Sequence, residues 1–308
     1  MRKTALECVH KLAQDDKRVL FIGSDLGYGV LEKMKNEIPD QFFMEGVSEQ
    51  YIIGMAAGLA MEGFIPYVNT IATFLTRRCY EQVAVDLCMH DLPVRLIANG
   101  GGGVYAPLGP THLAIEDIAI MRALPNMTVV APCDADEMNR LMMSTLEWPH
   151  PIYIRLARGG DPIVSAEKNG FELGKSIKMR DGVDGLFVTT GVMTQLALET
   201  ADILTADGVD VGVLHVHTIK PFDVEGVVSA IGNVKAVVTV EEHIVNGGLG
   251  SAVLESCSEL RPDLLPKISR IGIPDKFATE YGSQNSLLQH WGITSSTLID
   301  AMMKKLGG

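Results

Sequence analysis

The sequence predicts an α/β protein of two domains, each built on a parallel β-sheet covered by helices on both faces. Short apolar runs alternate with helical stretches along the chain, a pattern typical of parallel sheets. The length of 308 residues leaves room for two cores of ordinary size. Residues 161–183 are polar and broken by Gly and Pro, as interdomain linkers often are. We therefore predict domains at 1–160 and 184–308, joined by a linker at 161–183.

The first domain is predicted from apolar runs that read as buried strands, separated by longer stretches with helical periodicity. The strands are expected at 18–23, 41–44, 65–69, 94–98, 128–131 and 152–156. The helices are expected at 4–14, 50–62, 76–90, 115–122 and 134–147.

The second domain repeats the same alternation. Its strands are expected at 186–190, 211–215, 234–240 and 267–271, and its helices at 193–206, 224–231, 250–260 and 295–305. His215 and His217 would share one face of a strand, but with His243 they do not complete a familiar metal-binding spacing. We interpret these three histidines as structural, or as part of a subunit interface.

The composition excludes several classes of protein. Hydrophobic residues make up 47% of the chain and charged residues 21%, as in globular proteins. The net charge of −12 argues against binding to nucleic acid, and we see no apolar run long enough to cross a membrane. The five cysteines are scattered and form no CxxC pair, which favours a reducing, cytoplasmic location and argues against a structural metal site.

The most informative segment spans residues 42–68 (FFMEGVSEQYIIGMAAGLAMEGFIPYV). It predicts a short strand, a turn with Ser48 and Glu49, and a helix rich in Gly and Ala that would let another backbone approach closely. Glu49 has apolar sequence on both sides, and burial there would favour a protonated carboxyl able to share its proton with a ligand. The alternative is that Glu49 only stabilises the helix N-terminus.

Unusual residues follow the predicted strands, so we expect them at one edge of the first sheet. Ligands of open parallel sheets bind outside the carboxyl ends of the strands. This edge would carry Ser24 and Asp25, residues 45–49, residues 69–74, residues 99–112, and Arg158.

Two stretches of this edge have particular chemistry. Residues 73–78 (TFLTRR) place an aromatic ring before two cations, and residues 99–112 run from a string of four glycines to the tetrapeptide GPTH. The glycines match neither GxGxxG nor a Walker loop, but they remove side chains where a ligand or another chain must come close. His112 is a candidate proton carrier or hydrogen-bond donor to a polar substrate, although a lone loop histidine is often structural.

The order of motifs resembles the C-terminal half of transketolases and deoxyxylulose-phosphate synthases. The motifs are GVSEQ, TFLTRRCYEQ, LPVRLIA, GPTH, LPNMTVVAPCDADE, YIRLARG, TIKPFD and VEEHIVNGGLGSAV, and together they cover nearly all of the chain. The resemblance implies a pyrimidine-binding domain followed by a transketolase C-terminal domain. It also implies thiamine diphosphate as cofactor, held between the pyrimidine-binding domain and a diphosphate-binding domain of a neighbouring polypeptide.

Residue roles follow from the resemblance position by position. Glu49 matches the catalytic glutamate that hydrogen-bonds the aminopyrimidine ring and promotes loss of the thiazolium proton. Phe74 matches the aromatic residue that stacks on the pyrimidine, and Arg78 is expected beside the cofactor, although the spacing between these two positions varies. Asp25 matches an acid near the thiazolium, or else caps the next helix.

The resemblance also implies substrate contacts. Arg158 and Arg2 match cations that hold a sugar phosphate, for which a planar guanidinium is well suited. Arg2 alternatively forms a surface ion pair, since it lies near the N-terminus of the sequence. His112 is kept in GPTH and is expected to take part in catalysis and in substrate binding.

Departures from the transketolase pattern predict an unusual substrate. Transketolases usually carry a His-Asp pair in the loop before GPTH and an acidic residue directly before it. This chain has Gly100, Gly101 and Leu108 at those places. Losing a partner for a buried hydroxyl costs about 1–3 kcal/mol. We therefore expect a deoxy, branched or otherwise modified sugar in place of ordinary pentose and hexose phosphates.

A missing motif predicts a partner. The GDG…N motif that binds Mg²⁺ and the diphosphate has no counterpart here, and the sequence begins where a pyrimidine-binding domain would begin. We therefore expect no metal ligands in this chain. We also expect a separate subunit that binds the diphosphate and provides the main binding site for Mg²⁺. The expected enzyme is a split transketolase, an α₂β₂ heterotetramer in which two copies of this chain pair through the pyrimidine-binding domain.

Three alternatives stay open at the level of sequence. The chain could be the β subunit of a 2-oxo acid dehydrogenase, or a synthase that joins pyruvate to an aldehyde; both would release CO₂ from pyruvate. A catalytically silent scaffold is the third, and substitution of Glu49 would leave its activity intact.

Overall fold

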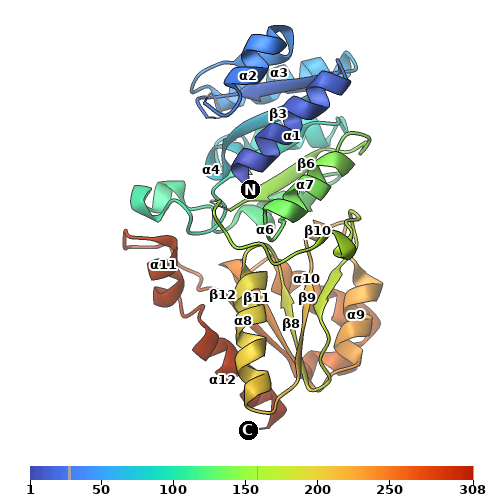
Figure 1. The fold of residues 1–308 in the computed structure, drawn as a ribbon, viewed down its shortest axis with the longest axis vertical. Coiled ribbons are helices and arrows are strands. Elements are labelled where there is room, and N and C mark those ends of the chain that lie inside the picture. The colour runs from blue at the N-terminus through green and yellow to red at the C-terminus, as the bar shows by residue number, and fades with distance from the viewer. Residues whose placement is uncertain (27–28, 158, 308) are drawn as a thin grey trace.

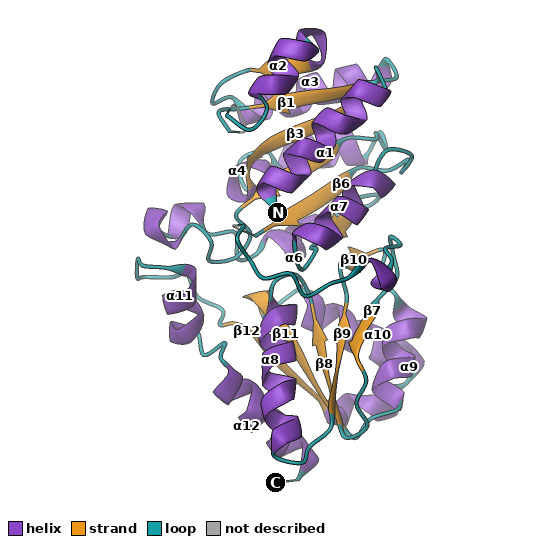
Figure 2. Cartoon of the chain, in the orientation of Figure 1, coloured by secondary structure: helices purple, strands orange, loops and turns teal. Residues whose placement is uncertain are grey.

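The protein is described from a computed structural model that covers residues 1–26, 29–157 and 159–307. Its described residues form two α/β domains with one sheet each, which confirms the predicted fold class. The first domain lies above the second in Figure 1, where colour runs from blue to red along the chain. Helices cover both faces of each sheet in Figure 2, as expected for strands that are apolar on both sides.

The first sheet has seven strands in the order β10-β5-β6-β4-β3-β1-β2, as far as the chain is described. Neighbouring strands from β5 to β2 run parallel, so their carboxyl ends share one edge. The strands are β1 (Val19–Gly23), β2 (Phe42–Met44), β3 (Ile65–Ile71), β4 (Arg95–Asn99), β5 (Thr128–Val130), β6 (Ile152–Leu156) and β10 (Thr218–Lys220).

Helices of the first domain pack on this sheet through small and branched apolar side chains. They are α1 (Arg2–Asp15), α2 (Glu32–Glu37), α3 (Glu49–Met61), α4 (Ala72–Thr76), α5 (Tyr80–Gln82), α6 (Asp117–Ala123) and α7 (Ala135–Ser144). A π-helical segment spans Val83–Cys88, and 3₁₀ turns span Pro39–Gln41, Ala106–Leu108, Pro110–His112 and Glu167–Asn169.

The second sheet has five strands in the order β12-β11-β8-β9-β7 within the described residues. The strands are β7 (Ile177–Arg180), β8 (Gly185–Thr189), β9 (Val211–His215), β11 (Ala236–Ile244) and β12 (Ile268–Ile273). The helices are α8 (Met193–Ala206), α9 (Val224–Gly232), α10 (Leu249–Leu260), α11 (Gln284–His290) and α12 (Ser295–Leu306), with a 3₁₀ stretch at Pro262–Lys267.

The two domains are joined by more than a linker. Strand β10 lies in the second half of the sequence but pairs antiparallel with β5 of the first sheet. Residues 177–180, which fall inside the predicted linker, form β7 and pair antiparallel with β9. The buried Arg155 side chain bonds Asp117 in the first domain, Nε to Oδ2 at 2.8 Å, and donates to the Glu242 carbonyl in the second.

Most of the predicted helices and strands are present in the structure, several with ends shifted by a few residues. Strand β9 and helix α8 have the predicted bounds. The single helix predicted at 76–90 is wrong: α4 ends at Thr76, α5 begins at Tyr80 and a π-helical segment follows. The sequence analysis also missed α2, β7, β10 and α11.

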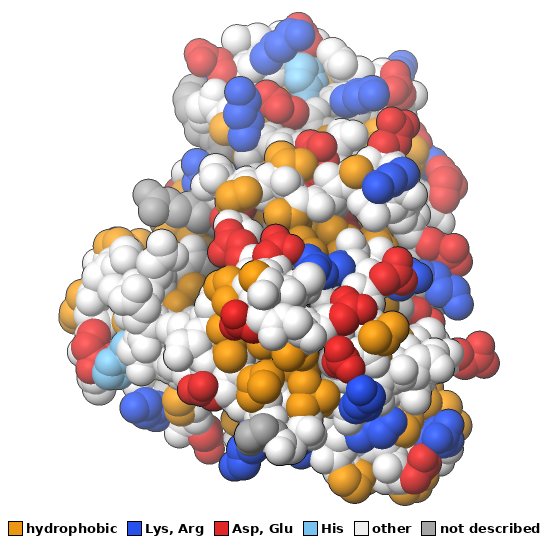
Figure 3. Space-filling view, turned by 60° about the horizontal axis from the view of Figure 1, so that its bottom comes forward, with side chains coloured by type: hydrophobic (Ala, Val, Ile, Leu, Met, Phe, Trp, Pro, Cys, Tyr) orange, Lys and Arg blue, Asp and Glu red, His pale blue; other side chains and the backbone are white. Residues whose placement is uncertain are grey.

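The surface carries charged side chains of both signs (Figure 3). On the face drawn in Figure 3, Lys and Arg side chains are scattered among Asp and Glu. None of the helices in the described part of the chain combines the length and apolar character needed to span a bilayer.

Candidate active site

Glu49 is the first residue of α3 and lies in the interior at the carboxyl edge of the first sheet. Only 2% of its surface is exposed. Its Oε2 accepts a hydrogen bond from Arg78 Nη1 at 2.8 Å, whereas Oε1 is buried and has no hydrogen-bond partner among the described residues. The partner of this carboxyl is therefore an arginine, and its second oxygen has no partner among the described residues.

Arg78 links Glu49 to an aromatic pair. Its guanidinium carbon lies 4.1 Å from the centroid of the Phe74 ring, a cation–π contact. The Phe74 ring meets the His112 ring edge-on, with centroids 5.3 Å apart and an interplanar angle of 64°. These four residues, which we name the Glu49 cluster, come from three separate segments of the chain. The structure thus brings together four of the predicted site residues.

The backbone beneath the cluster is tied together by buried polar side chains. Asn69 Nδ2 donates to the Ile97 carbonyl at 3.1 Å, and Asn99 Nδ2 donates to the Thr70 carbonyl at 3.0 Å. These bonds join the ends of β3 and β4. They place α4, which carries Phe74, beside the loop that carries His112.

Arg77 holds the GPTH loop against α4. Its guanidinium bonds the Glu116 carboxylate and donates to the Leu113 carbonyl at 2.8 Å. The two neighbouring arginines therefore have different roles, since Arg78 binds Glu49. The sequence analysis grouped them as a pair of cations and missed the anchoring role of Arg77, because Glu116 lies 39 residues away.

The glycines before GPTH are approached by side chains of the same chain. A Cβ atom on Gly101 would lie 2.6 Å from Arg155, and one on Gly102 would lie 2.4 Å from Glu242 of the second domain. The Gly103 amide donates to Glu242 Oε1 at 2.8 Å. The space expected for a ligand or another chain is therefore filled by a side chain of the first domain at Gly101 and of the second domain at Gly102. Farther along, a Cβ atom on Gly109 would lie 2.6 Å from the ring of Tyr281, which comes shortly before α11.

The remaining predicted residues lie apart from the Glu49 cluster or outside the described chain. Asp25 is exposed and accepts a hydrogen bond from Ser24 Oγ at 3.0 Å. Arg2 lines a cleft of about 300 Å³ beyond the ends of β4 and β6, together with Asn99, Gly100 and Tyr105. Arg158 lies outside the described residues.

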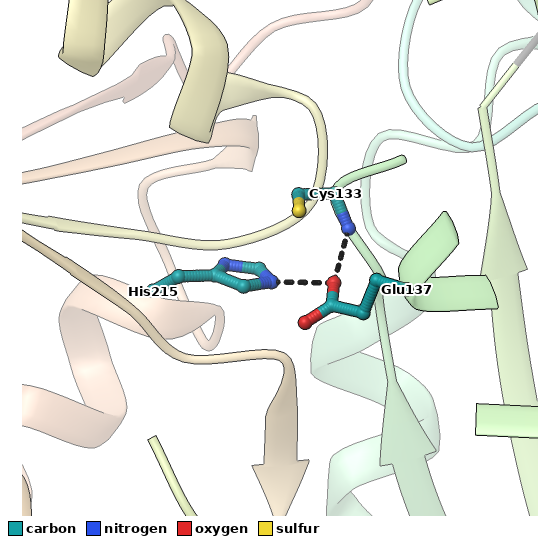
Figure 4. A group of neighbouring side chains, drawn as sticks. All are labelled: Cys133, Glu137 and His215. Atoms are coloured by element: carbon teal, nitrogen blue, oxygen red, sulfur yellow. Dashed lines mark hydrogen bonds and ion pairs between the residues drawn. The ribbon is translucent and has the colours of Figure 1, made fainter. Parts of the chain in front are cut away.

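A second buried group lies where the domains meet. Glu137 Oε2 accepts hydrogen bonds from the Cys133 amide at 2.6 Å and from His215 Nε2 at 2.9 Å (Figure 4). His215 Nδ1 bonds Thr194 Oγ1 at 2.9 Å. Burial opposes ionisation of Glu137, but pairing with His215 outweighs it and lowers the pKa of this carboxyl to about 2.

The Cys133, Glu137 and His215 side chains offer three metal-ligand atoms within 4.8 Å of one another. Both ring nitrogens of His215 already have partners, and burial raises the pKa of the Cys133 thiol far above its usual value, which disfavours the metal-binding thiolate. We therefore interpret the group as a hydrogen-bonded clamp between domains. The sequence analysis missed it because Glu137 and His215 are 78 residues apart.

Comparison with protein families agrees with this architecture. Residues 1–160 match the family model "Transketolase, pyrimidine binding domain", and residues 174–298 match "Transketolase, C-terminal domain". Both matches lie on the two domains in the order that the sequence analysis predicted.

Individual relatives include a protein that is named as a transketolase subunit. A putative uncharacterized transketolase family protein, y4mN, of Sinorhizobium fredii is 39% identical and covers 96% of this chain and 85% of its own length. The 6-deoxy-6-sulfo-D-fructose transketolase subunit SqwH of a Clostridium strain is 34% identical, and the match covers 98% of this chain and 92% of that subunit. The 1-deoxy-D-xylulose-5-phosphate synthase of Thermosynechococcus vestitus is 35% identical, but the chain spans only 47% of its length.

A solved structure shows the same fold over the whole chain. It is described as a split gene transketolase, inactive beta4 tetramer, and it matches with a TM-score of 0.91 at 35% identity. The match covers 99% of this chain and 98% of that one.

Proposed function

The chain belongs to the transketolase family, and we propose that it works as the second subunit of a split transketolase that transfers a two-carbon ketol unit from a ketose to an aldose. The observation that carries this proposal is the buried Glu49 carboxyl, which has one unpartnered oxygen and pairs with an arginine that also contacts the Phe74 ring. Relatives that are named as transketolase subunits and match nearly end to end support the split arrangement.

The Glu49 cluster fits thiamine diphosphate, the cofactor of this family. When bound, the cofactor supplies a carbon nucleophile and a sink for electrons during carbon–carbon bond cleavage. Glu49 Oε1 would share a proton with the pyrimidine ring nitrogen, and Phe74 would stack on the ring. The Arg78 guanidinium covers one face of Phe74, so stacking uses the other face or displaces Arg78.

Substrate binding is assigned to the polar groups around the same edge. We propose that Arg2 and Arg158 hold the phosphate or another anionic group of the sugar, that His112 exchanges a proton or hydrogen bond with a substrate hydroxyl, and that Asp25 lies near the thiazolium. Gly100, Gly101 and Leu108 offer neither cation nor carboxylate, which supports a modified sugar as substrate.

The assembly is proposed as an α₂β₂ heterotetramer with Mg²⁺ and the diphosphate bound by the partner subunit. Copies of this chain would pair through α3 and the residues just before it. The exposed fractions of Val47, Tyr51 and Met61 in this segment are 68%, 59% and 56%. A cytoplasmic location is proposed from the cysteines, which are all buried and free.

The experiment that tests the proposal is co-expression of this chain with a candidate diphosphate-binding subunit encoded beside it. The purified complex, supplied with thiamine diphosphate and Mg²⁺, is screened with ketose donors and aldose acceptors by mass spectrometry. We expect products lengthened by two carbons only when both subunits are present. Ketol transfer by this chain alone would contradict the split arrangement, and no transfer by any complex would contradict the function.

A pyruvate-using enzyme is the second candidate, favoured by the similarity to 1-deoxy-D-xylulose-5-phosphate synthases. The same complex is supplied with pyruvate and an aldehyde. Release of CO₂ from pyruvate together with a condensed product would favour this candidate over ketol transfer, and release of CO₂ without a condensed product would favour a 2-oxo acid dehydrogenase.

A further inference from the structure

Tyr105 fills the space over Gly100. A Cβ atom on Gly100 would lie 2.1 Å from Cε2 of the Tyr105 ring, far inside van der Waals contact. Gly100 also has a φ angle of +80°, in the region that favours glycine. Any side chain at residue 100 would therefore clash with the Tyr105 ring in its present position. Glycine at residue 100 leaves the space to the ring.

The same ring lines the cleft that Arg2 shares with Asn99. This cleft encloses about 300 Å³ at the carboxyl edge of the first sheet. Asn99 is 2% exposed, and its Nδ2 donates to the Thr70 carbonyl. Because only the amide nitrogen can donate, this bond fixes the orientation of the side-chain amide and therefore the position of Oδ1. That Oδ1 is buried and accepts no hydrogen bond from any described residue.

The three polar groups of the cleft have different capacities. Arg2 offers guanidinium donors, Asn99 Oδ1 is an acceptor, and the Tyr105 hydroxyl can donate. Burial raises the pKa of Tyr105 although the nearby Arg2 guanidinium opposes the shift, so the phenol is neutral and keeps its proton. A ligand that satisfies all three groups carries an anionic end and a neighbouring hydroxyl, as an acidic sugar does.

We propose that Tyr105 is a specificity-determining residue, which bounds the sugar-binding cleft with its ring and hydrogen-bonds the sugar through its hydroxyl, while Asn99 Oδ1 accepts from a sugar hydroxyl. The proposal rests on the proposed function for the identity of the reaction, but Arg2, Asn99 and Tyr105 all lie in this chain. Binding can therefore be measured without the partner subunit.

The test measures binding of 2-deoxy-D-ribose 5-phosphate, a deoxy sugar phosphate, and of D-ribose 5-phosphate to the purified full chain by ligand-observed NMR. D-ribose and inorganic phosphate are separate probes. We expect the Tyr105→Phe substitution to weaken the binding of ribose 5-phosphate about three- to tenfold, because one hydrogen bond is lost. Binding of inorganic phosphate should stay within twofold of wild type. Tyr281→Phe, which removes the hydroxyl of an exposed ring that does not line the cleft, is the matched control.

Steric exclusion is tested by a second pair of variants. Gly100→Ala should reduce binding of ribose 5-phosphate in the wild-type background more than in a Tyr105→Ala background, where the clash is absent but the backbone strain remains. This comparison separates the clash from the strain that any side chain at residue 100 would cause.

The outcomes separate the two proposals. Absence of binding of both the deoxy and the ordinary sugar phosphate, or equal binding by wild type and Tyr105→Phe, overturns the inference. Tyr105-dependent binding by a chain whose complexes transfer no ketol unit overturns the proposed function and leaves the inference standing. In an active complex, we expect Tyr105→Phe to raise the KM of the acceptor about three- to tenfold with little change in kcat.

Discussion

The Arg78 guanidinium and the Glu49 carboxylate form an ion pair of 2.8 Å in which the carboxylate is almost fully buried and the arginine is partly exposed. The pair spans 29 residues of sequence and joins the start of α3 to the segment after α4. The ion pair allows the Glu49 carboxylate to be buried, because the positive charge of Arg78 offsets part of the free-energy cost of removing the carboxylate from water.

Substitution of Arg78 by alanine is expected to destabilise the chain. The change leaves the buried Glu49 carboxyl without its partner, and we expect a loss of about 1–2 kcal/mol, between the values for exposed and buried ion pairs. Urea denaturation of the purified chain measures the loss. In a Glu49→Gln background the same arginine substitution should cost less. An equal loss in both backgrounds would show that the ion pair does not contribute to stability.

Substitution of Phe74 by alanine is expected to weaken cofactor binding in the two-subunit complex. The variant removes the ring on which the pyrimidine would stack, and we expect the Kd of thiamine diphosphate to rise about tenfold. Isothermal titration calorimetry measures the change. Phe64→Ala, at a partly buried phenylalanine just before β3 and so at the opposite edge of the sheet, serves as the control. Unchanged affinity in Phe74→Ala would exclude this ring from the cofactor site.

His217 is expected to make stability depend on pH. Burial lowers the pKa of this imidazole from 6.5 to about 4. Between these values the unfolded chain binds a proton that the folded chain does not, so the free energy of unfolding falls as the pH falls. The slope for one group reaches about 1.4 kcal/mol per pH unit.

Urea denaturation at several values between pH 7 and pH 4 tests this expectation. The His217→Asn variant should show a flatter dependence than wild type, whereas substitution of the exposed His90 should leave the slope unchanged. Glu137 acts at lower pH, because its pKa falls from 4.5 to about 2 and its stabilising effect disappears as the pH falls through that range. Equal slopes for wild type and His217→Asn would contradict the assignment.

Much of the fold could be predicted from local sequence, because buried parallel strands are apolar runs. Strand β9 and helix α8 agree residue for residue with the sequence-based bounds. The missed elements depend on distant contacts or on weak local signals. Strand β10 has three residues and exists because it pairs with β5, nearly ninety residues earlier in the sequence.

The candidate site was predicted in part. Glu49, Phe74, Arg78 and His112 meet at one edge, as the carboxyl ends of parallel strands require. Tyr105, Arg77 and the Glu137–His215 contact could not be predicted, since their roles depend on side-chain packing between segments far apart. The break of the helix after Thr76, which separates α4 from α5, also has no clear signal in the sequence.

The most direct test of the account is the rate of hydrogen–deuterium exchange at the reactive thiazolium carbon of thiamine diphosphate bound to the two-subunit enzyme. If Glu49 shares its proton with the pyrimidine ring, Glu49→Gln should slow this exchange by about 10²–10⁴-fold while the variant still folds and binds the cofactor. Glu62→Gln, at an exposed carboxyl beyond the other end of α3, should exchange like wild type. Exchange in Glu49→Gln at the wild-type rate would contradict the account.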